Sequence, residues 1–587
     1  MSPVQTHPGP SGGPRTFVAV GAGQAAASAA RTLRRQGYDG RIVLVGDEPH
    51  APYQRPPLSK EYLADGPAGT ELALLSGRWC EENAVELRLG TPAVRIDRAA
   101  GAVELADGER IAGDRFLLAT GARPRRLPGV EGERIIHLRR IEDAERLRGF
   151  LRPGARIAVI GAGFIGSELA SAVLDAGGQP VVVERAEAPL ERQLGRRFGG
   201  VCAEIQRAAG VELHTGEALS SVRETGRGVL VTTDSGLCVE ADALVVAVGA
   251  VPDTALAEAS GLDVGDGVLV DERLRTSDPR IWAAGDAAAQ WHPLYGRRIR
   301  TEHVDNADRQ GATVARNVLG GAVVHDDPLW SWSDQFGLNL QHCGHAERWD
   351  RIVVRGSVEE RDFVAFYLDE GRLRAAFGME RGGEVLAAKE LIALGARPDP
   401  AALADEDVEL DELAGPEVPV VFPVPPGGRE AGPPAGGPAD GPAGGPADEP
   451  AGGPADGPAE GPADAPEREY VRVARSGQVP EGVVRRFHVG ELELAVTRYG
   501  GRAYASSNYC THLDCLLSSG RPTREGLLCS CHGSVFDYAT GEPLSPPARL
   551  PIRVFPVREV DGEILVGLIP GEPLPGPRSR RGAAAPR

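Results

Sequence analysis

Two glycine-rich turns of the same type, 140 residues apart, constrain the fold of this chain more than any other feature. Each turn follows an apolar strand and opens a helix: TFVAV (16–20) leads into GAGQAA (21–26), and RIAVI (156–160) leads into GAGFIG (161–166). Such a turn lets the backbone approach a pyrophosphate, whose negative charge the helix N-terminus stabilises. The sequence therefore predicts two dinucleotide-binding domains, each built on a parallel sheet.

An acidic residue follows the second strand of each unit. Asp47 comes after the strand at 41–45, and Glu184 comes after the strand at 181–183. A carboxylate at this place accepts hydrogen bonds from ribose hydroxyls and repels a 2′-phosphate, so Glu184 favours NADH over NADPH. Arg185 follows directly and could accommodate that phosphate, which leaves NADPH open as an alternative.

The C-terminal part contains two pairs of metal-ligand residues. Cys510 and His512 form the first pair, and Cys529 and His532 follow after sixteen intervening residues. Two thiolates and two neutral imidazoles are the ligand set of a Rieske [2Fe-2S] centre. A structural zinc uses the same residue types, but the zinc-finger spacing is absent, and a secreted disulfide module would need an export signal. Short β-type runs around the motif predict a small antiparallel domain.

The chain from about residue 17 to residue 398 resembles the flavin-dependent ferredoxin reductases of bacterial oxygenase systems and the related apoptosis-inducing-factor-like reductases. The resemblance rests on seven stretches beyond the glycine turns: APYQRPPLSK (51–60), ATGARP (119–124), LR (138–139), TSDP (276–279), GD (285–286), TEHVDNA (301–307) and WSDQ (332–335). It implies that the chain binds FAD and NADH.

The same resemblance implies roles for individual residues. The residues expected to hold FAD are Gly21, Gly23, Ala26, Asp47, Arg55, Lys60, Arg139, Asp286 and Val304. The residues expected to hold the nicotinamide cofactor are Gly161, Gly163, Gly166 and Glu184. As alternatives, Lys60 and Arg139 could be solvated surface charges, and His303 could be a purely structural histidine.

Relatives of this fold that reduce disulfides carry a cysteine soon after the first strand–helix–strand unit, as the nucleophile beside the flavin. Here that region reads YQRPPLSK (53–60) and has no cysteine. We therefore expect the flavin to pass electrons onward singly, and we expect no catalytic acid, base or nucleophile among the side chains.

The cluster motif resembles that of high-potential Rieske proteins. This resemblance implies a disulfide between Cys515 and Cys531, with a reduced pair as the alternative, because disulfides are unusual in the cytosol. It also implies that the Ser534 hydroxyl donates to a cluster sulfur. Those proteins carry a tyrosine where this chain has Phe536, and losing that donor predicts a lower reduction potential.

A segment rich in Gly, Pro, Ala and acidic residues separates the two halves. Residues 400–467 contain 15 Asp or Glu and one Arg, which gives −14 of the net charge of −19. The remaining charge is small and indicates no nucleic-acid partner. No apolar run approaches the roughly 18 residues of a membrane span, so we expect no membrane association and a cytoplasmic location.

The expected fold is an α/β flavoprotein with two dinucleotide-binding domains (glutathione-reductase-like), then a small α+β domain, a disordered linker and an all-β Rieske domain. The expected boundaries are 1–15 tail, 16–125 with 250–326 FAD-binding domain, 126–249 NAD-binding domain, 327–400 α+β domain, 401–467 linker, 468–570 Rieske domain and 571–587 tail.

The expected function is NADH-dependent electron transfer through FAD and the chain's own [2Fe-2S] cluster to an acceptor such as an oxygenase or a cytochrome P450, by a monomer or homodimer. The alternative is an NADH-sensing redox protein of the apoptosis-inducing-factor type. A Rieske subunit of a quinol-oxidising complex is disfavoured, because the sequence shows no membrane anchor.

Overall fold

The computed structural model describes residues 16–70, 72–410, 413, 469–490, 492–512, 515–523, 526–530, 533–545 and 548–568. They fall largely into an N-terminal unit that ends near residue 414 and a C-terminal β-rich unit. The predicted tails and most of the predicted linker lie outside the described residues. No helix of the described ranges is long and apolar enough to cross a membrane.

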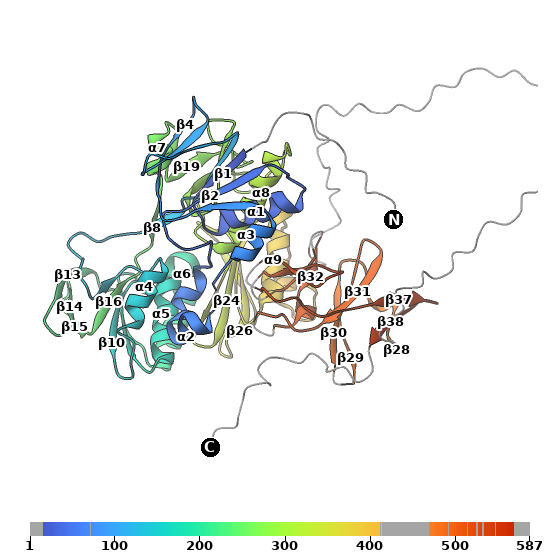
Figure 1. Cartoon of the computed structure of the whole chain (residues 1–587). Helices are drawn as coiled ribbons and strands as arrows, with labels where there is room; N and C mark the ends of the chain where they lie inside the picture. Colours follow the sequence, from blue (N-terminus) through green and yellow to red (C-terminus); the bar gives the residue numbers. More distant parts are fainter. Residues whose placement is uncertain are drawn as a thin grey trace, which may run out of the picture. The chain divides into compact units, whose positions relative to one another are not determined.

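The first predicted nucleotide-binding unit forms a five-stranded parallel sheet with the strand order β20-β7-β1-β2-β3. Figure 1 labels β1 and β2 of this sheet. Its strands are β1 (Thr16–Val20), β2 (Arg41–Val45), β3 (Val85–Arg88), β7 (Arg115–Leu118) and β20 (Ile281–Ala283). Strand β20 comes from the later part of the chain, so this domain is assembled from two separate segments.

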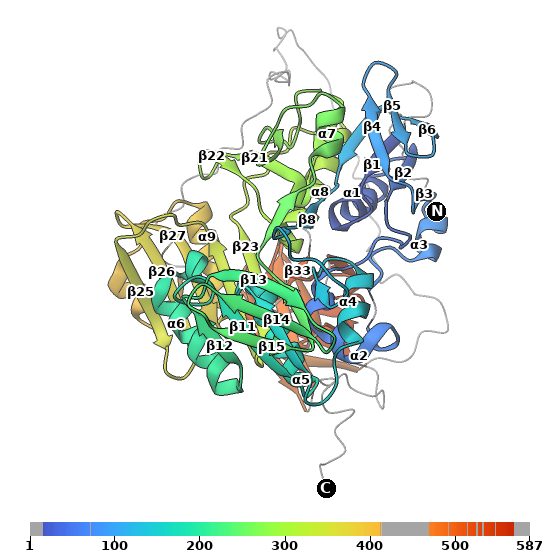
Figure 2. The ribbon, with the colours of Figure 1, turned by 90° about the vertical axis from the view of Figure 1, so that its left-hand side faces the viewer.

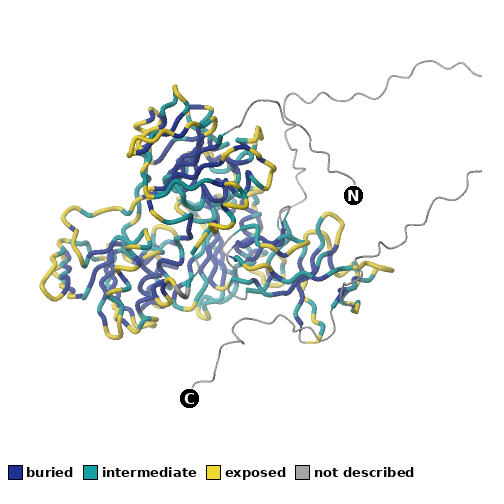
Figure 3. The backbone as a smooth tube through the Cα atoms, viewed as in Figure 1, coloured by how far each residue is buried: buried dark blue, intermediate teal, exposed yellow. Residues whose placement is uncertain are grey.

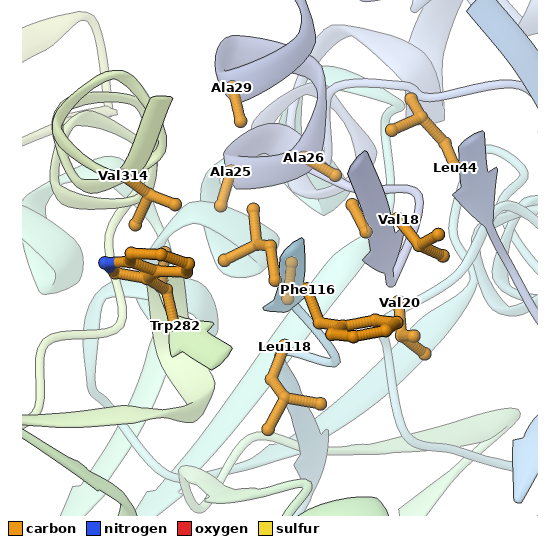
Figure 4. Packing of buried hydrophobic residues seen from close by; sticks show 14 of the residues in the cluster. Val18, Val20, Ala25, Ala26, Ala29, Leu44, Phe116, Leu118, Trp282 and Val314 are labelled. Atoms are coloured by element: carbon orange, nitrogen blue, oxygen red, sulfur yellow. The ribbon is translucent and has the colours of Figure 1, made fainter. Parts of the chain in front are cut away.

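Helices α1 (Gln24–Arg35) and α8 (Val304–Val318) pack closely beside this sheet (Figure 4). A Cβ atom at Gly311 would lie 2.2 Å from the Ala25 carbonyl oxygen, so only glycine permits this approach of the two helices. The alanines of α1, Val314 and Ala315 of α8 and the apolar side chains of the sheet form one buried cluster. This packing holds both helices against the sheet.

The second unit forms another five-stranded parallel sheet, with the order β12-β11-β10-β16-β9. Its elements are β9 (Ile135–Ile136), α4 (Ile141–Arg148), β10 (Arg156–Ile160), α5 (Phe164–Asp175), β11 (Gln179–Glu184), α6 (Glu191–Ala209), β12 (Glu212–Thr215) and β16 (Ala243–Val246). The two parallel sheets confirm the interpretation of both glycine turns.

The chain enters and leaves the second unit through two paired strands. Strand β8 (Ala122–Pro124) leads in and pairs antiparallel with β17 (Ala250–Pro252), which leads out. Gly121 and Gly249, which precede them, both have positive φ, at 73° and 91°. These glycines mark the crossing between domains, where the chain must turn sharply.

Smaller elements complete the N-terminal unit. Its antiparallel additions are β4 (Ala93–Asp97), β5 (Ala102–Leu105), β6 (Arg110–Ala112), β13 (Leu219–Glu224), β14 (Val229–Thr233), β15 (Cys238–Ala241), β18 (Val264–Gly265) and β22 (Arg297–Ile299), and β19 (Gly267–Val270) and β21 (Ala288–His292) pair in parallel. Its short helices are η1 (Pro56–Ser59), α2 (Glu61–Gly69), α3 (Gly77–Glu82), α7 (Ala255–Ala259) and η2 (Gly285–Ala287).

The predicted α+β domain is an antiparallel sheet in the order β23-β24-β27-β26-β25. It comprises β23 (Trp330–Gln335), β24 (Leu338–Gly344), β25 (Arg351–Ser357), β26 (Asp362–Asp369), β27 (Arg372–Met379), α9 (Gly382–Ala393) and α10 (Pro400–Ala404). Helix α6 lies beside this sheet (Figure 2). Phe198 of α6 packs there against Phe363 and Phe377. This domain therefore packs against the second unit.

The predicted start of the linker at residue 401 is wrong by about ten residues. Leu403 and Leu410 are buried, and the Arg355 guanidinium donates to the carbonyl oxygens of Asp405, Glu406 and Val408. The prediction relied on the acidic composition of this stretch. It therefore missed the two leucines that are buried and the backbone carbonyl groups that bind Arg355.

In the described part of the C-terminal unit the named strands pair antiparallel, as predicted. They are β28 (Glu469–Arg475), β29 (Val484–Val489), β30 (Leu492–Tyr499), β31 (Arg502–Ser507), β32 (Arg521–Pro522), β33 (Leu527–Leu528), β34 (Val535–Phe536), β35 (Pro543–Ser545), β36 (Val554–Phe555), β37 (Val557–Val560) and β38 (Glu563–Leu568), with the short helices η4 (Ser476–Gln478) and η5 (Leu517–Ser519). Buried apolar residues of β30, β31 and β38 form its core. Figure 3 colours the buried parts of the backbone dark blue.

Candidate functional site

A cavity of about 1120 Å³ lies in the N-terminal unit. Residues predicted to hold FAD line it together: Gly21, Gly23, Asp47, Arg55, Lys60, Arg139, Asp286 and Val304. Ala26 is fully buried in α1 beneath the glycine turn and does not line the cavity. Phe164, Ile165 and Glu168, at the start of α5, also line it, so the first turn of the helix that follows Gly163 reaches the same space.

The first glycine turn has the backbone that its sequence requires. Gly21 has φ of 108°, and a Cβ atom there would lie 2.0 Å from the Ala119 carbonyl oxygen. A Cβ atom at Gly23 would meet no protein atom within 4 Å, so this residue faces open space at the cavity wall. The turn is fixed by the neighbouring strand on one side and is free to approach a ligand on the other.

Two adjacent acids lie at the end of β2, and sequence reasoning selected only the first. Asp47 is half exposed and forms an ion pair with Arg140 at 2.5 Å. Glu48, which the prediction missed, is nearly buried and accepts hydrogen bonds from Tyr53 at 2.6 Å and Arg55 at 2.7 Å. Burial acts to raise the pKa of Glu48, but Arg55 and Tyr53 hold it below its ordinary value. The nearby Tyr53 and Arg55, two hydrogen-bond donors close in sequence, could have indicated Glu48 as a buried acceptor.

Lys60 and Arg139 are not solvated surface charges. The Lys60 ammonium lies 3.0 Å from a Glu168 carboxylate oxygen, and Arg139 lies 2.8 Å from Asp286. Glu168 is a second residue that the sequence prediction missed; a carboxylate among the apolar residues of FIGSELASAVLD (164–175) was its signal.

His303 lies at the junction of α8 and the cavity. Its Nδ1 accepts a hydrogen bond from the Asp305 backbone N–H, so it caps the helix, and its ring packs edge-on against Trp332. Burial lowers the pKa of His303 to about 4, which keeps the imidazole neutral. His303 thus has a structural role and also lines the cavity.

The second glycine turn repeats the geometry of the first. Gly161 has φ of 101°, and a Cβ atom at Gly166 would lie 2.0 Å from the Gly161 carbonyl oxygen. The Glu184 carboxylate accepts hydrogen bonds from the backbone N–H groups of Ala162 and Ala186, at 2.6 and 2.7 Å. Each carboxylate oxygen has a second lone pair for a ribose hydroxyl, so this geometry fits the predicted role. Gly161, Gly163, Gly166 and Glu184 do not line the cavity themselves.

In the C-terminal unit, the predicted cluster ligands lie in two loops. Cys510 and Cys529 are buried, and His512 is half-buried. The Cys510 N–H donates to the Cys515 carbonyl oxygen at 2.8 Å, which closes the first loop, and Cys529 directly follows β33. The fourth predicted ligand, His532, lies outside the described residues.

Cys515 is disulfide-bonded. Its predicted partner, Cys531, lies outside the described residues. The described ranges contain no group of three His, Cys, Asp or Glu side chains gathered around one metal position. A two-iron cluster divides its cysteines and histidines between two irons, so the described ligands need not converge on one point.

Comparisons with known proteins agree with both halves of this description. The family description "Pyridine nucleotide-disulphide oxidoreductase" matches residues 15–311, "Reductase C-terminal" matches 330–414, and "Rieske [2Fe-2S] domain" matches 469–556.

Curated relatives match the N-terminal two thirds of the chain over nearly their whole length. Rhodocoxin reductase of Rhodococcus erythropolis is 38% identical over 400 residues, 67% of this chain and 93% of the relative. The ferredoxin–NAD(+) reductase component of the anthranilate 1,2-dioxygenase system of Burkholderia cepacia is 38% identical over 398 residues, 67% and 98%. A crystal structure of the covalent putidaredoxin reductase–putidaredoxin complex matches with a TM-score of 0.66 and 35% identity, over 68% of this chain and 98% of that one.

These relatives bear out the predicted resemblance, fold class, enzyme class and cofactors, and they do not favour the NADH-sensing alternative. The chain belongs to the pyridine nucleotide-disulphide oxidoreductase family, as an NAD(P)H-dependent flavoprotein oxidoreductase that uses FAD and NADH and carries a Rieske [2Fe-2S] domain.

Proposed function

We propose that this chain takes electrons from NADH at the cavity of its N-terminal unit and delivers them, through the cluster of its own C-terminal unit, to an oxygenase or a cytochrome P450. When bound, FAD would supply the conversion of a two-electron hydride, whose departure leaves NAD+, into two single-electron transfers, and the proton of the hydride would be released to solvent.

The observation that carries this proposal is the shared lining of the cavity. Residues of the first glycine turn and residues at the start of α5 face one space, so a flavin and a nicotinamide can meet there. No cysteine of the described chain lines the cavity, which argues against a thiol as the next carrier. The Rieske domain in the same chain provides a one-electron carrier instead.

The roles proposed for individual residues follow from their positions. The backbone at Gly21 and Gly23 would approach the FAD pyrophosphate, and Asp47 and Glu48 would face its ribose end. Lys60, Arg55, Arg139, Asp286 and Val304 would surround the rest of the cofactor. Residues Cys510, His512, Cys529 and His532 would hold the cluster, and Cys515 would join Cys531.

The acceptor is proposed from the names of the relatives. They include a component of a dioxygenase system and a reductase solved in complex with putidaredoxin. A reductase that carries its own Rieske domain has no need of a separate ferredoxin, so we expect it to act directly on the terminal enzyme. We expect the protein to be a monomer or a homodimer.

Anaerobic addition of NADH to the purified holoprotein tests this route. We expect the flavin absorbance to bleach first and the EPR signal of a reduced Rieske centre to appear afterwards, within seconds. Flavin bleaching with a cluster that stays oxidised would refute the internal transfer, and slow bleaching accompanied by a change in oligomeric state would support the sensing alternative.

Replacing Glu184 tests the preference for NADH. Since Glu184→Ala removes the acceptor of the ribose hydroxyls, we expect the Kd of NADH to rise about tenfold and the preference over NADPH to shrink. Arg185→Ala is the companion variant and should weaken only NADPH. Equilibrium titration of both nucleotides measures the two constants, and an unchanged NADH/NADPH ratio in Glu184→Ala would contradict the assignment.

The residues behind the cluster loops give a prediction about its potential. Ser534 and Phe536 are both fully buried. Phe536→Tyr should raise the reduction potential on the order of tens of millivolts, because an added hydroxyl donor stabilises the reduced cluster, and Ser534→Ala should lower it. An EPR-monitored redox titration measures both, and a Phe536→Tyr potential at or below that of the wild type would overturn this expectation.

A further inference from the structure

A single buried carboxylate joins three separate parts of the N-terminal unit. Glu168, on α5, accepts a hydrogen bond from Ser59 at 2.6 Å through Oε2. Its Oε1 accepts a hydrogen bond from Ser333 at 2.6 Å and lies 3.0 Å from the Lys60 ammonium. These donors come from η1, from the residue after it and from β23, so the nicotinamide-side helix, the flavin-side domain and the α+β domain meet at this one group.

Ser333 is oriented to donate to Glu168. Its side chain is fully buried, and the Gln335 side-chain amide donates to its oxygen at 3.1 Å. A hydroxyl has one proton to give, and since Gln335 occupies an acceptor position, that proton points to the Glu168 carboxylate. A hydrogen bond to an ionised acceptor is shorter and stronger than a neutral one, in agreement with the 2.6 Å separation.

Ser333 and Lys60 share the same carboxylate oxygen. Lys60 and Glu168 both line the cavity, whereas Ser333 does not. Without the Ser333 hydroxyl, Oε1 of Glu168 would be held by Lys60 alone. The carboxylate could then rotate while it keeps only its hydrogen bond from Ser59. The ammonium would then lose its fixed place at the cavity wall.

We propose that Ser333 is a positioning residue for hydride transfer from NADH: it fixes the Glu168 carboxylate, which in turn holds the Lys60 ammonium at the wall shared by the flavin-side and nicotinamide-side residues of the cavity. Ser333 touches neither cofactor and acts only through Glu168. The inference rests on the proposed function of the cavity.

Several charged groups act on Lys60. Glu168 on α5, Asp334 on β23 and Glu61 on α2 attract the ammonium, and His303 lies close enough for its pKa to be lowered by Lys60. Burial acts to lower the pKa of Lys60, but Glu168 and Asp334 together raise it above its ordinary value. Moving Glu168 therefore changes the field that Lys60 presents to the cavity.

Ser333→Ala in the holoprotein is the direct test. We expect the rate of flavin reduction at saturating NADH to fall about ten- to a hundredfold, because small displacements near a reacting pair are costly, with the Kd of NADH nearly unchanged. Ser333→Thr keeps the hydroxyl and should restore most of the rate. Gln335→Met leaves the hydroxyl but removes its orienting donor, and should give a smaller loss in the same direction even if Ser333→Ala fails to fold.

Ser171→Ala is the matched control. Its hydroxyl accepts a hydrogen bond from the Phe336 N–H at 2.8 Å, so it also joins α5 to the end of β23, whereas the described hydroxyl hydrogen bonds of the Glu168 carboxylate come from Ser59 and Ser333. We expect this variant to change the rate by less than about threefold. An equal loss in Ser171→Ala and Ser333→Ala would reduce Ser333 to a general packing role and overturn the proposal.

Two further measurements separate this inference from the function on which it rests. In a Glu168→Gln background, Ser333→Ala should have little further effect on the rate, and fully additive losses would overturn the route through Glu168. A pH titration of the absorbance of oxidised bound flavin, without NADH, measures the apparent pKa of the groups around the flavin. This apparent pKa should shift in Ser333→Ala and not in Ser171→Ala. If wild-type flavin were not reduced by NADH, the proposed function would fail while this titration still decided the role of Ser333.

Discussion

Replacing Cys529 by serine is expected to abolish the Rieske EPR signal while leaving reduction of the flavin by NADH intact. Cys529 is fully buried directly after β33, and a serine hydroxyl there cannot replace a thiolate as an iron ligand. The iron and acid-labile sulfide content of the purified variant should fall close to zero. Flavin absorbance after anaerobic NADH addition should still bleach, because the cavity lies in the N-terminal unit.

Cys238→Ser provides the control for this experiment. Cys238 is an exposed free thiol on β15, and its replacement should leave iron content, EPR signal and flavin reduction at wild-type levels. A Cys529→Ser protein that keeps a normal Rieske signal would remove this residue from the ligand set.

Gly21→Ala is expected to yield a protein without FAD. The added Cβ atom would lie 2.0 Å from the Ala119 carbonyl oxygen, at a φ of 108° that an alanine rarely adopts. The strained backbone alone costs about 1–3 kcal/mol, and the displaced β7–β8 connection would distort the turn that faces the cavity. The purified variant should lack the yellow absorbance of bound flavin and should unfold at a lower temperature.

Gly37→Ala separates the two contributions to this effect. Gly37 also has a positive φ, of 78°, but a Cβ atom there would meet no atom within 4 Å. It should therefore lose only about 1–2 kcal/mol of stability and keep its FAD. Normal flavin content in Gly21→Ala would show that the turn tolerates a side chain and would undermine its assignment as the pyrophosphate site.

The local parts of the architecture could be predicted from the sequence because each is encoded within a few residues. A β-branched strand, a glycine turn and an alanine-rich helix specify the first unit between residues 16 and 35, and the cluster ligands are spaced by their own loops.

Contacts between distant residues could not be predicted in this way. Glu168 lies 109 residues from Ser59 and 165 residues from Ser333, and its partners become evident only when three domains are in place. Asp47 was expected to face a ribose, and the structure shows that Arg140, 93 residues away, also binds it. Composition indicated a linker from residue 401, yet Leu403 and Leu410 are anchored in the folded domain.

The paired strands β8 and β17 have a consequence for engineering. Because the chain enters and leaves the second nucleotide-binding unit side by side, that unit is an insert whose two ends are adjacent. Such an insert can be exchanged as a cassette, joined at Arg123 and Val251, which are register partners in the strand pair. A graft from a relative with a different coenzyme preference would then change which nicotinamide drives the protein, provided that it keeps a carboxylate at the position of Glu168.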